Sequence, residues 1–269
     1  INHLDEPTLE NLKTKLSETT DKITIKEFSG SNLILVSNKF SKNTPLLSNL
    51  EKECRSIILD KNTLKVVCYT YDDIYYNQDA KNYVLENDSL TQIIMECFEG
   101  TLLSVFNYND IWHVSTRKCI DARNSKWKND KSFYDLFLDC IDSEDTFFSN
   151  LKKENNYYFV LVHHLNKHLI DYSETFGNNY NKLIHVMTRE SDTSKEISLD
   201  NIEQWGDKTI HFEQPTIYKD YSILNEYNKL DKLELPIKSE GVLVKIYNPE
   251  NGKSDILKLQ TNAYQFMSM

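Results

Sequence analysis

The sequence predicts an α+β fold in which antiparallel sheets are flanked by helices. Strand-like segments alternate with helix-like ones, and the strands come in pairs separated by short turns. Two such hairpins are expected, one joining 102–106 to 111–115 and the other joining 241–247 to 255–260. Pairing of this kind argues against a parallel sheet, whose strands need long crossover connections.

The spacing of apolar residues assigns the remaining elements. Leu9, Leu12 and Leu16 recur at helical intervals and predict a first helix over 8–19. Phenylalanine, leucine and cysteine side chains on one face predict a second helix over 132–142. Further strands are expected at 32–37, 54–60, 64–71, 157–163, 168–171 and 183–188, with a turn at 60–63, and a further helix is expected at 216–231.

The length allows one large domain or two small ones, and because no Gly/Ser-rich linker splits the chain we expect a single domain spanning 1–269, with no visible C-terminal domain. A chain of 269 residues with 39% hydrophobic content can bury a full core. No apolar run approaches the roughly 20 residues needed to cross a bilayer, and nothing resembles a signal peptide, so no membrane partner is expected. The five cysteines are odd in number and lack a CxxC pair, which favours free thiols in a reducing compartment such as the cytoplasm.

The net charge restricts how this chain can meet nucleic acid. Lys and Arg number 31 against 41 Asp and Glu, which gives a formal charge of -10. Non-specific binding to a long strand depends on phosphate neutralisation by a basic surface. Contact with RNA is therefore expected from a local basic groove, or else the ligand is one nucleotide or a strand end. The alternative is that the charge only keeps the protein in solution.

One short segment, Cys-Phe-Glu-Gly-Thr at 97–101, precedes the first hairpin and carries the clearest functional signal. It resembles the active-site segment of RNA ligases related to the phage T4 RNA ligase 1 group, which carry Lys-x-(Asp/Glu)-Gly-(Ser/Thr) there. In those covalent nucleotidyltransferases the lysine becomes joined to AMP, whereas this chain has Cys97 at that position. Glu99 and Gly100 keep the rest of the pattern, and a glycine lets the backbone approach a ligand closely.

Further motifs extend the resemblance over about 30–262 and imply the ATP-grasp-like nucleotidyltransferase fold of RNA and DNA ligases. Arg55 stands where the family has an arginine that reaches the nucleotide's phosphates, a role suited to a planar guanidinium. Thr116 and Arg117 match a segment that lies near the ribose and phosphates. Tyr158 and Phe159 match the start of another strand of the family, and either Tyr158 or Phe159 is expected to stack on a base.

The C-terminal motifs are kept in part. Glu240 and Lys245 match a Glu-Gly-x-Val-x-Lys segment, in which the glutamate lies on the metal side. Lys258 keeps the first lysine of the closing Lys-x-Lys strand, whereas the second is Gln260. Val160 stands where the family has a glutamate that helps to hold the metal, and an isopropyl group offers no oxygen to a hard cation.

The three departures, Cys97, Val160 and Gln260, fall on the nucleophile, a metal-side acid and a phosphate-neutralising cation. The resemblance therefore implies a pseudoenzyme with no catalytic residue, which binds a nucleotide or an RNA 5′ end and acts in RNA processing or translation. The expected ligand is ATP, GTP or a cap-like guanine nucleotide, the last by analogy with capping enzymes. The predicted binding residues are Arg55, Glu99, Gly100, Thr116, Arg117, Phe159, Glu240, Lys245 and Lys258.

Metal binding is not predicted. Loss of the acid at Val160 argues against Mg²⁺ and leaves Glu240 as the one candidate ligand. His163, His164 and His168 lie close together in the sequence but lack an accompanying carboxylate or cysteine pattern.

Two other functions stay open on the sequence. An active ATP-dependent RNA ligase would need a displaced lysine, such as Lys118, although Lys118 falls after the second strand of the hairpin. A protein-interaction scaffold with a vestigial pocket would suit the acidic charge and the 16 tyrosines, and it would have a protein partner. The AT-rich codon usage that the composition suggests, and the family's presence in large DNA viruses, point to a viral protein and a viral factory as its location.

Overall fold

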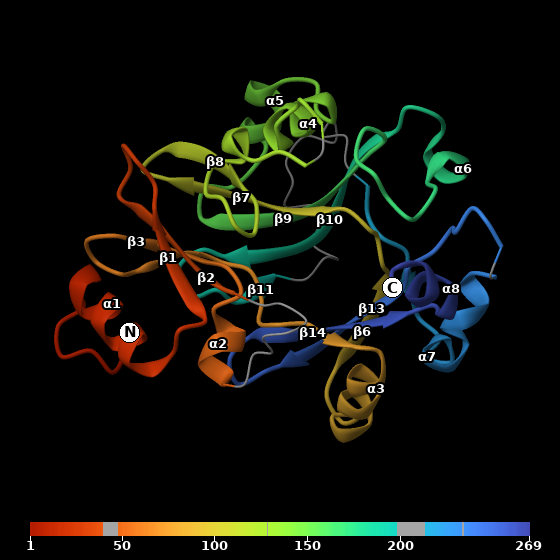
Figure 1. Cartoon of the computed structure of the whole chain (residues 1–269), viewed down its shortest axis with the longest axis horizontal. Helices are drawn as coiled ribbons and strands as arrows, with labels where there is room; N and C mark the ends of the chain where they lie inside the picture. Colours follow the sequence, from red (N-terminus) through yellow and green to blue (C-terminus); the bar gives the residue numbers. More distant parts are fainter. Residues whose placement is uncertain (40–47, 128, 198–212, 233) are drawn as a thin grey trace.

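The computed structural model describes residues 1–39, 48–127, 129–197, 213–232 and 234–269. Its strands form three sheets, and helices lie around their outer faces (Figure 1). Of the strand pairs in these ranges, only β5 with β14 is parallel, whereas the others are antiparallel. The structure therefore confirms the predicted α+β class with antiparallel sheets.

The N-terminal sheet has the order β1-β2-β3-β4 and is covered by the first helix. Thr8 caps that helix, because its side chain accepts a hydrogen bond from the backbone of Asn11. Leu12 then packs with Ile34 and Val36 of the sheet. The elements are α1 (Leu9–Thr19), β1 (Ile23–Glu27), β2 (Leu33–Asn38), α2 (Asn49–Glu53), β3 (Ile57–Asp60) and β4 (Val66–Tyr69).

The second sheet has the order β11-β10-β9-β7-β8 and packs one face against two short helices. Ser132 and Asp135 form a capping box that starts the first of them. The core between sheet and helices holds Phe137, Phe147 and Phe159. The elements are β7 (Thr101–Tyr108), β8 (Ile111–Ser115), a 3₁₀ turn (Ala122–Asn124), α4 (Phe133–Asp139), α5 (Glu144–Ser149), β9 (Asn155–His163), α6 (Ser173–Phe176), β10 (Asn181–Glu190) and β11 (Glu196–Ile197).

The third sheet has the order β12-β6-β13-β14-β5, and α3 packs on it through the fully buried Ala80. Figure 1 shows this sheet facing the second one across the middle of the molecule. The elements are β5 (Tyr75–Tyr76), α3 (Asn77–Glu86), β6 (Gln92–Glu96), β12 (Ile217–Tyr218), α7 (Ile223–Glu226), a 3₁₀ turn (Tyr227–Leu230), β13 (Gly241–Asn248), β14 (Lys253–Gln260) and α8 (Asn262–Met267).

Most predicted elements agree with the structure, including both hairpins and the first helix. The helix expected at 216–231 is wrong, because Ile217 and Tyr218 pair with the edge of β6 instead. The side chain of Asp220 then accepts a hydrogen bond from the backbone of Ser222, which begins only a short helical segment. At 168–171 there is an isolated bridge from Ile170, and the strand expected from residue 54 begins at Ile57.

Within the described ranges, no helix combines the length and apolar character needed to cross a membrane.

Candidate functional site

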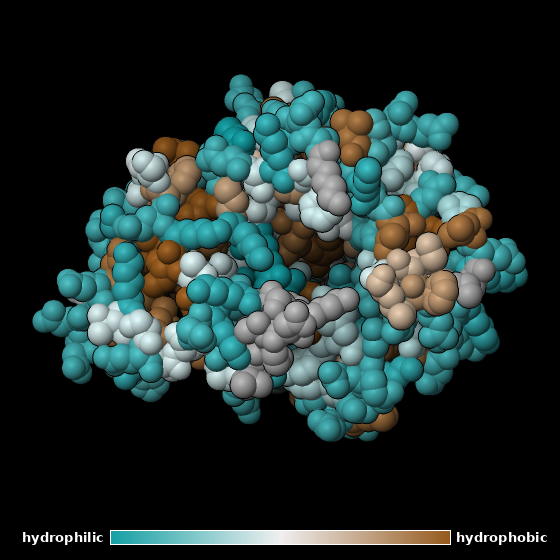
Figure 2. All heavy atoms as spheres, viewed as in Figure 1, coloured by the Kyte–Doolittle hydropathy of each residue, from teal (hydrophilic) through white to brown (hydrophobic). Residues whose placement is uncertain are grey.

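A cavity of about 560 Å³ lies between the second and third sheets. Leu102 and Val160 line it from β7 and β9, and Leu243 and Ile256 line it from β13 and β14. Figure 2 shows a hollow with a hydrophobic floor in the middle of the face that it presents. Two facing sheets thus supply apolar walls for a base or another flat group.

The charge on the walls is opposite to that of the whole protein. Among the described residues that line the cavity, the acid is Glu96 alone. The lining cations are Arg55, Arg117, Lys118, Lys126, Lys245 and Lys258. A basic cavity in a chain of net charge -10 indicates an anionic ligand.

Cys97 lies just after β6, at the position where the resemblance expects the nucleophilic lysine. Its side chain is buried, and its Sγ donates to Glu240 Oε2 across 3.4 Å. Burial, together with the charge of Glu240, raises the pKa of the Cys97 thiol far above its ordinary value. The thiol is therefore neutral at physiological pH and is not an activated nucleophile.

Glu240 is the centre of a closed network that we call the Cys97 corner, formed by Cys97, Glu240, Lys258 and Gln260. Glu240 Oε1 accepts from Lys258 Nζ at 3.4 Å and from Gln260 Nε2 at 3.1 Å. Burial lowers the pKa of Lys258, but the acidic groups around it, the carboxylate of Glu240 among them, outweigh burial and raise this pKa above its ordinary value. Lys258 is therefore a cation rather than a nucleophile, and Glu240 lies outside the residues that line the cavity.

Asn77, at the start of α3, completes this corner. Its Nδ2 donates to Gln260 Oε1 at 3.1 Å, and its Oδ1 accepts from the Gln260 backbone at 2.8 Å. Gln260, which replaces the second lysine of the motif, is thus fixed by hydrogen bonds to Asn77 and to Glu240. Glu240 offers little for a metal ion here, because both of its oxygens already accept hydrogen bonds.

Arg55 and Arg117, which we call the arginine corner, lie on another part of the cavity wall. Arg55 Nη1 is 3.3 Å from Asp73 Oδ1, and its guanidinium lies over the ring of Tyr71. Arg117 Nη2 donates to Asn38 Oδ1 at 2.7 Å, an uncharged partner. Burial and the charge of Arg55 lower the pKa of Arg117 to about 10. The positive charge of this corner is compensated only in part.

Lys245 and Thr116 also line the cavity, as the sequence places them in the binding set. Lys245 Nζ is 3.1 Å from Glu196 Oε2, and Glu196 also meets the fully buried Arg189 at 3.5 Å. The charge of Lys245 is therefore compensated within the protein. Thr116 is buried at the end of β8, where its backbone forms a bridge with Cys119.

Gly100 lines the cavity, and its lack of a side chain is required by the packing. A Cβ at this position would lie 2.4 Å from the carbonyl oxygen of Leu161. Glu99 instead turns away from the cavity: its Oε1 accepts from the Leu169 backbone and its Oε2 accepts from the Tyr264 hydroxyl, both at 2.6 Å. The geometry therefore gives Glu99 a structural role, in contrast to the nucleotide contact expected from the sequence.

Phe159 has a different position from the one that the sequence suggests. Side chains alternate along β9, so Val160 faces the cavity and Phe159 faces the core under α5. The Phe159 ring has no exposed surface and lies 5.8 Å from the ring of Phe147. It cannot stack on a base in this arrangement, and Val160 supplies only a methyl surface to the cavity.

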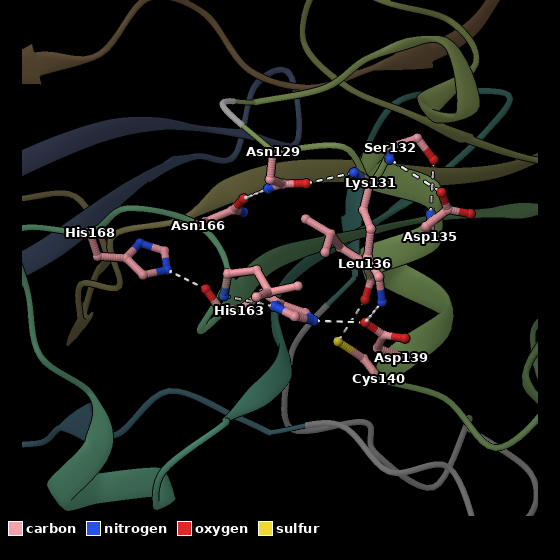
Figure 3. A network of polar contacts seen from close by, with 11 residues as sticks. Asn129, Lys131, Ser132, Asp135, Leu136, Asp139, Cys140, His163, Asn166 and His168 are labelled. Atoms are coloured by element: carbon pink, nitrogen blue, oxygen red, sulfur yellow. Dashed lines mark hydrogen bonds and ion pairs between the residues drawn. The ribbon is translucent and has the colours of Figure 1, made fainter.

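The histidines near the end of β9 hold the chain rather than a metal (Figure 3). The Leu165 backbone N–H donates to His163 Nδ1 at 3.1 Å, so the neutral ring carries its proton on Nε2, which lies 2.9 Å from Asp139 Oδ2. His168 Nε2 donates to the His163 carbonyl at 3.0 Å. In the part of the chain that the structure describes, no group of three or more His, Cys, Asp or Glu residues is placed to hold a metal ion.

The structure adds residues that no motif identified. Trp127 lines the cavity with 53% of its surface exposed, beside Lys126. Tyr71 and Tyr76 line the wall near the arginine corner, and Tyr76 is 41% exposed. An exposed tryptophan next to a lysine is a signal that a sequence can carry, but its place on the cavity wall depends on the tertiary fold.

Comparison with solved structures identifies the fold. A putative ATP-dependent DNA ligase from Aquifex aeolicus matches 96% of this chain at 14% identity, with a TM-score of 0.61, and an archaeal ATP-dependent RNA ligase matches 96% at 12% identity, with a TM-score of 0.59. This chain covers 64% and 63% of those two chains. A Naegleria gruberi RNA ligase mutant with ATP and Mn matches 74% of this chain at 11% identity and 58% of its own length, with a TM-score of 0.51.

Two curated viral proteins resemble part of the sequence. An immediate-early protein ICP-46 homolog of Invertebrate iridescent virus 6 is 27% identical over 107 residues, which is 38% of this chain and 23% of the relative. A putative bifunctional polynucleotide kinase/RNA ligase of Autographa californica nuclear polyhedrosis virus is 27% identical over 101 residues, which is 35% of this chain and 14% of the relative.

No family model matches the sequence. The structural neighbours nevertheless include ligases of RNA and of DNA, and both partial relatives are viral proteins. The chain has the covalent nucleotidyltransferase fold of ATP-dependent RNA and DNA ligases.

Proposed function

We propose that this protein binds a nucleotide or an RNA 5′ end in the cavity between its sheets, without forming a covalent nucleotide intermediate. One observation carries the proposal: the position of the expected lysine is occupied by a buried, neutral thiol that donates to Glu240. A phosphoramidate requires an amine at that point, and no side-chain rearrangement of Cys97 can supply one.

The other lysines on the cavity wall support the same proposal. Lys258 and Lys245 are paired with the carboxylates of Glu240 and Glu196, so both side chains are engaged within the protein. Lys118 is exposed at the rim, without the burial that activates a nucleophilic lysine. The second candidate function, an active ligase that uses Lys118, is therefore less well supported.

The walls favour a phosphate-bearing ligand over an uncharged one. Apolar surface from two sheets and six lining cations match the two halves of a nucleotide, a base and its phosphates. ATP, GTP and a cap-like guanine nucleotide all belong to this class. A protein with this property would act in RNA processing or translation by recognising an end rather than by joining it.

The test combines a covalent assay with an equilibrium one. The protein is incubated with Mg²⁺ and α-³²P-labelled ATP or GTP and run on a denaturing gel beside an authentic RNA ligase, while calorimetry measures binding of the same nucleotides. We expect no labelled band and measurable binding. A band that disappears in Lys118→Ala would establish the ligase function instead, and absence of both labelling and binding would support the scaffold.

A further inference from the structure

A second cavity, of about 570 Å³, opens beside the first. It is bounded by side chains of α2, β5 and α3. The two cavities share part of their lining, and the shared residues are Arg55, Ile74, Tyr76 and Arg117. The arginine corner therefore stands at the junction of two adjoining spaces, each with room for a nucleoside.

The side chains at the junction carry a net positive charge. Arg55 has Asp73 as its carboxylate partner, whereas Arg117 contacts the amide oxygen of Asn38 and forms no ion pair among the described residues. The Nε of Arg117 is buried and has no hydrogen-bond partner among the residues that the structure describes. A buried guanidinium N–H without an acceptor is costly, and a phosphate oxygen would supply that acceptor while it relieves the repulsion from Arg55.

Away from the arginine corner, the lining of the second cavity is aromatic and carries more acidic than basic side chains. The rings of Tyr75 and Tyr83 lie stacked, with their centroids 4.4 Å apart. Apart from Asp73 and the two arginines, the charged residues of its lining are two acids, Asp79 and Glu86, and one base, Lys52. Further phosphates would meet net repulsion here, whereas an uncharged ring system would find aromatic and polar surface.

We infer that the site takes a ligand with two nucleosides joined through phosphate, with the phosphate on the arginine corner and one nucleoside in each cavity. The inference rests on the proposed function and names its ligand class. A linear dinucleotide at an RNA 5′ end and a 5′–5′-linked pair, as in a cap, share this chemistry. Mononucleotides fill only the first cavity.

Calorimetry with four probes tests the inference: AMP, ATP, the linear dinucleotide pApA and the 5′–5′-linked ApppA. We expect pApA or ApppA to bind at least about tenfold more tightly than both mononucleotides, and the tighter of the two identifies the linkage. Asn82 is exposed and lines only the second cavity, so Asn82→Trp should fill that space. This variant should remove the advantage of the two-nucleoside probes and leave the affinity for AMP unchanged.

Lys81→Trp is the matched control, since Lys81 directly precedes Asn82 on α3 and lies outside the linings of both cavities. It should bind all four probes as the wild type does. The inference is overturned if neither two-nucleoside probe exceeds the mononucleotides, or if Asn82→Trp weakens AMP as much as ApppA. Those outcomes leave the proposed function standing, whereas failure of the wild type to bind any probe would contradict the proposed function itself.

Discussion

The Cys97 corner and the arginine corner lie on the walls of one cavity and treat charge in opposite ways. In the Cys97 corner, the carboxylate of Glu240 meets the ammonium of Lys258, an amide and a thiol, so the charges cancel within the protein. In the arginine corner, among the described residues, Asp73 forms an ion pair with Arg55, whereas Arg117 has only the amide oxygen of Asn38. The charges of the Cys97 corner are balanced without a ligand, and the arginine corner keeps a net positive charge.

This difference separates two properties that an active ligase combines. Chemistry at the α-phosphate needs a nucleophile and preorganised charge next to it, whereas affinity needs only complementary charge on the wall. In the Cys97 corner, where the resemblance expects the chemistry, the structure has an ion pair between Glu240 and Lys258. In the arginine corner, the Nε of Arg117 has no acceptor among the described residues, and under the proposed function this difference serves binding without turnover.

The strongest test of the closed corner is Glu240→Gln. The substitution keeps the shape of the side chain but leaves Lys258, whose side chain is 20% exposed, as a partly buried cation without its counter-charge, so we expect a loss of up to about 3 kcal/mol in the free energy of unfolding, the low end of the range for buried pairs. Urea denaturation measures this loss. Glu174→Gln breaks the exposed pair with Lys238 and should cost at most about 1 kcal/mol, because solvent screens it.

In the same experiment, Glu240→Gln/Lys258→Met should recover much of the lost stability, because no buried charge remains. Equal losses in Glu240→Gln and Glu174→Gln would show that the Cys97 corner is not a buried ion pair in solution.

The reactivity of Cys97 gives a second test. Because burial and Glu240 raise the pKa of its thiol above the ordinary value, deprotonation requires a higher pH than in the unfolded chain. We expect alkylation by iodoacetamide to be on the order of a hundredfold slower in the native protein than in urea at pH 8. Mass spectrometry of the peptides follows each thiol, with the half-buried Cys119 as an internal reference. Rapid native alkylation of Cys97 would contradict the neutral, closed corner.

The open corner is tested by Arg117→Ala. Charge-assisted hydrogen bonds contribute about 1.5–3 kcal/mol each, so the affinity for ATP should fall roughly 10- to 100-fold. Calorimetry measures the change, and urea denaturation checks that the variant is folded. Lys65→Ala removes an exposed cation that pairs with Asp192 and lies outside the cavity lining, and it should leave ATP binding as in the wild type.

The smallest effect is expected for Lys118→Ala. Lys118 is exposed at the rim, where solvent screens its charge, so ATP affinity should fall by no more than about fivefold. The comparison with Arg117→Ala sharpens the assignment, since both variants remove one positive charge from the same wall. A larger loss of ATP affinity in Lys118→Ala than in Arg117→Ala would show that the phosphates bind at the rim and not at the arginine corner.

Much of this cavity can be located from the sequence, because many of the motif residues line its walls in the structure. Arg55, Gly100, Thr116 and Lys258 all line it, at a distance from one another in the chain. Their order along the sequence was enough to predict the fold that the structural neighbours share. Two of the three departures from the motif, Cys97 and Gln260, meet at Glu240 in the structure, whereas the third, Val160, lies on β9.

Three residues of the predicted binding set lie elsewhere for reasons that the sequence does not display. Phe159 and Val160 are neighbours on one strand, so their side chains point to opposite faces of the sheet. The packing under α5 decides which of the two faces the core. Glu99 and Glu240 turn toward partners that are distant in sequence, Tyr264 and Lys258 among them. The second cavity was missed because, apart from Arg55 and Arg117, its walls come from segments such as α2, β5 and α3, where no motif lies.

The opposition between a basic cavity and an acidic surface has a consequence for the rate of association. At a distance, an anionic ligand meets the repulsion of a chain with net charge -10, and only inside the cavity does it meet the lining cations. Salt screens the long-range field over about 8 Å at physiological ionic strength but affects buried pairs much less. Moderate salt should therefore speed the capture of nucleotides, the reverse of the behaviour of proteins that attract nucleic acid through a basic surface.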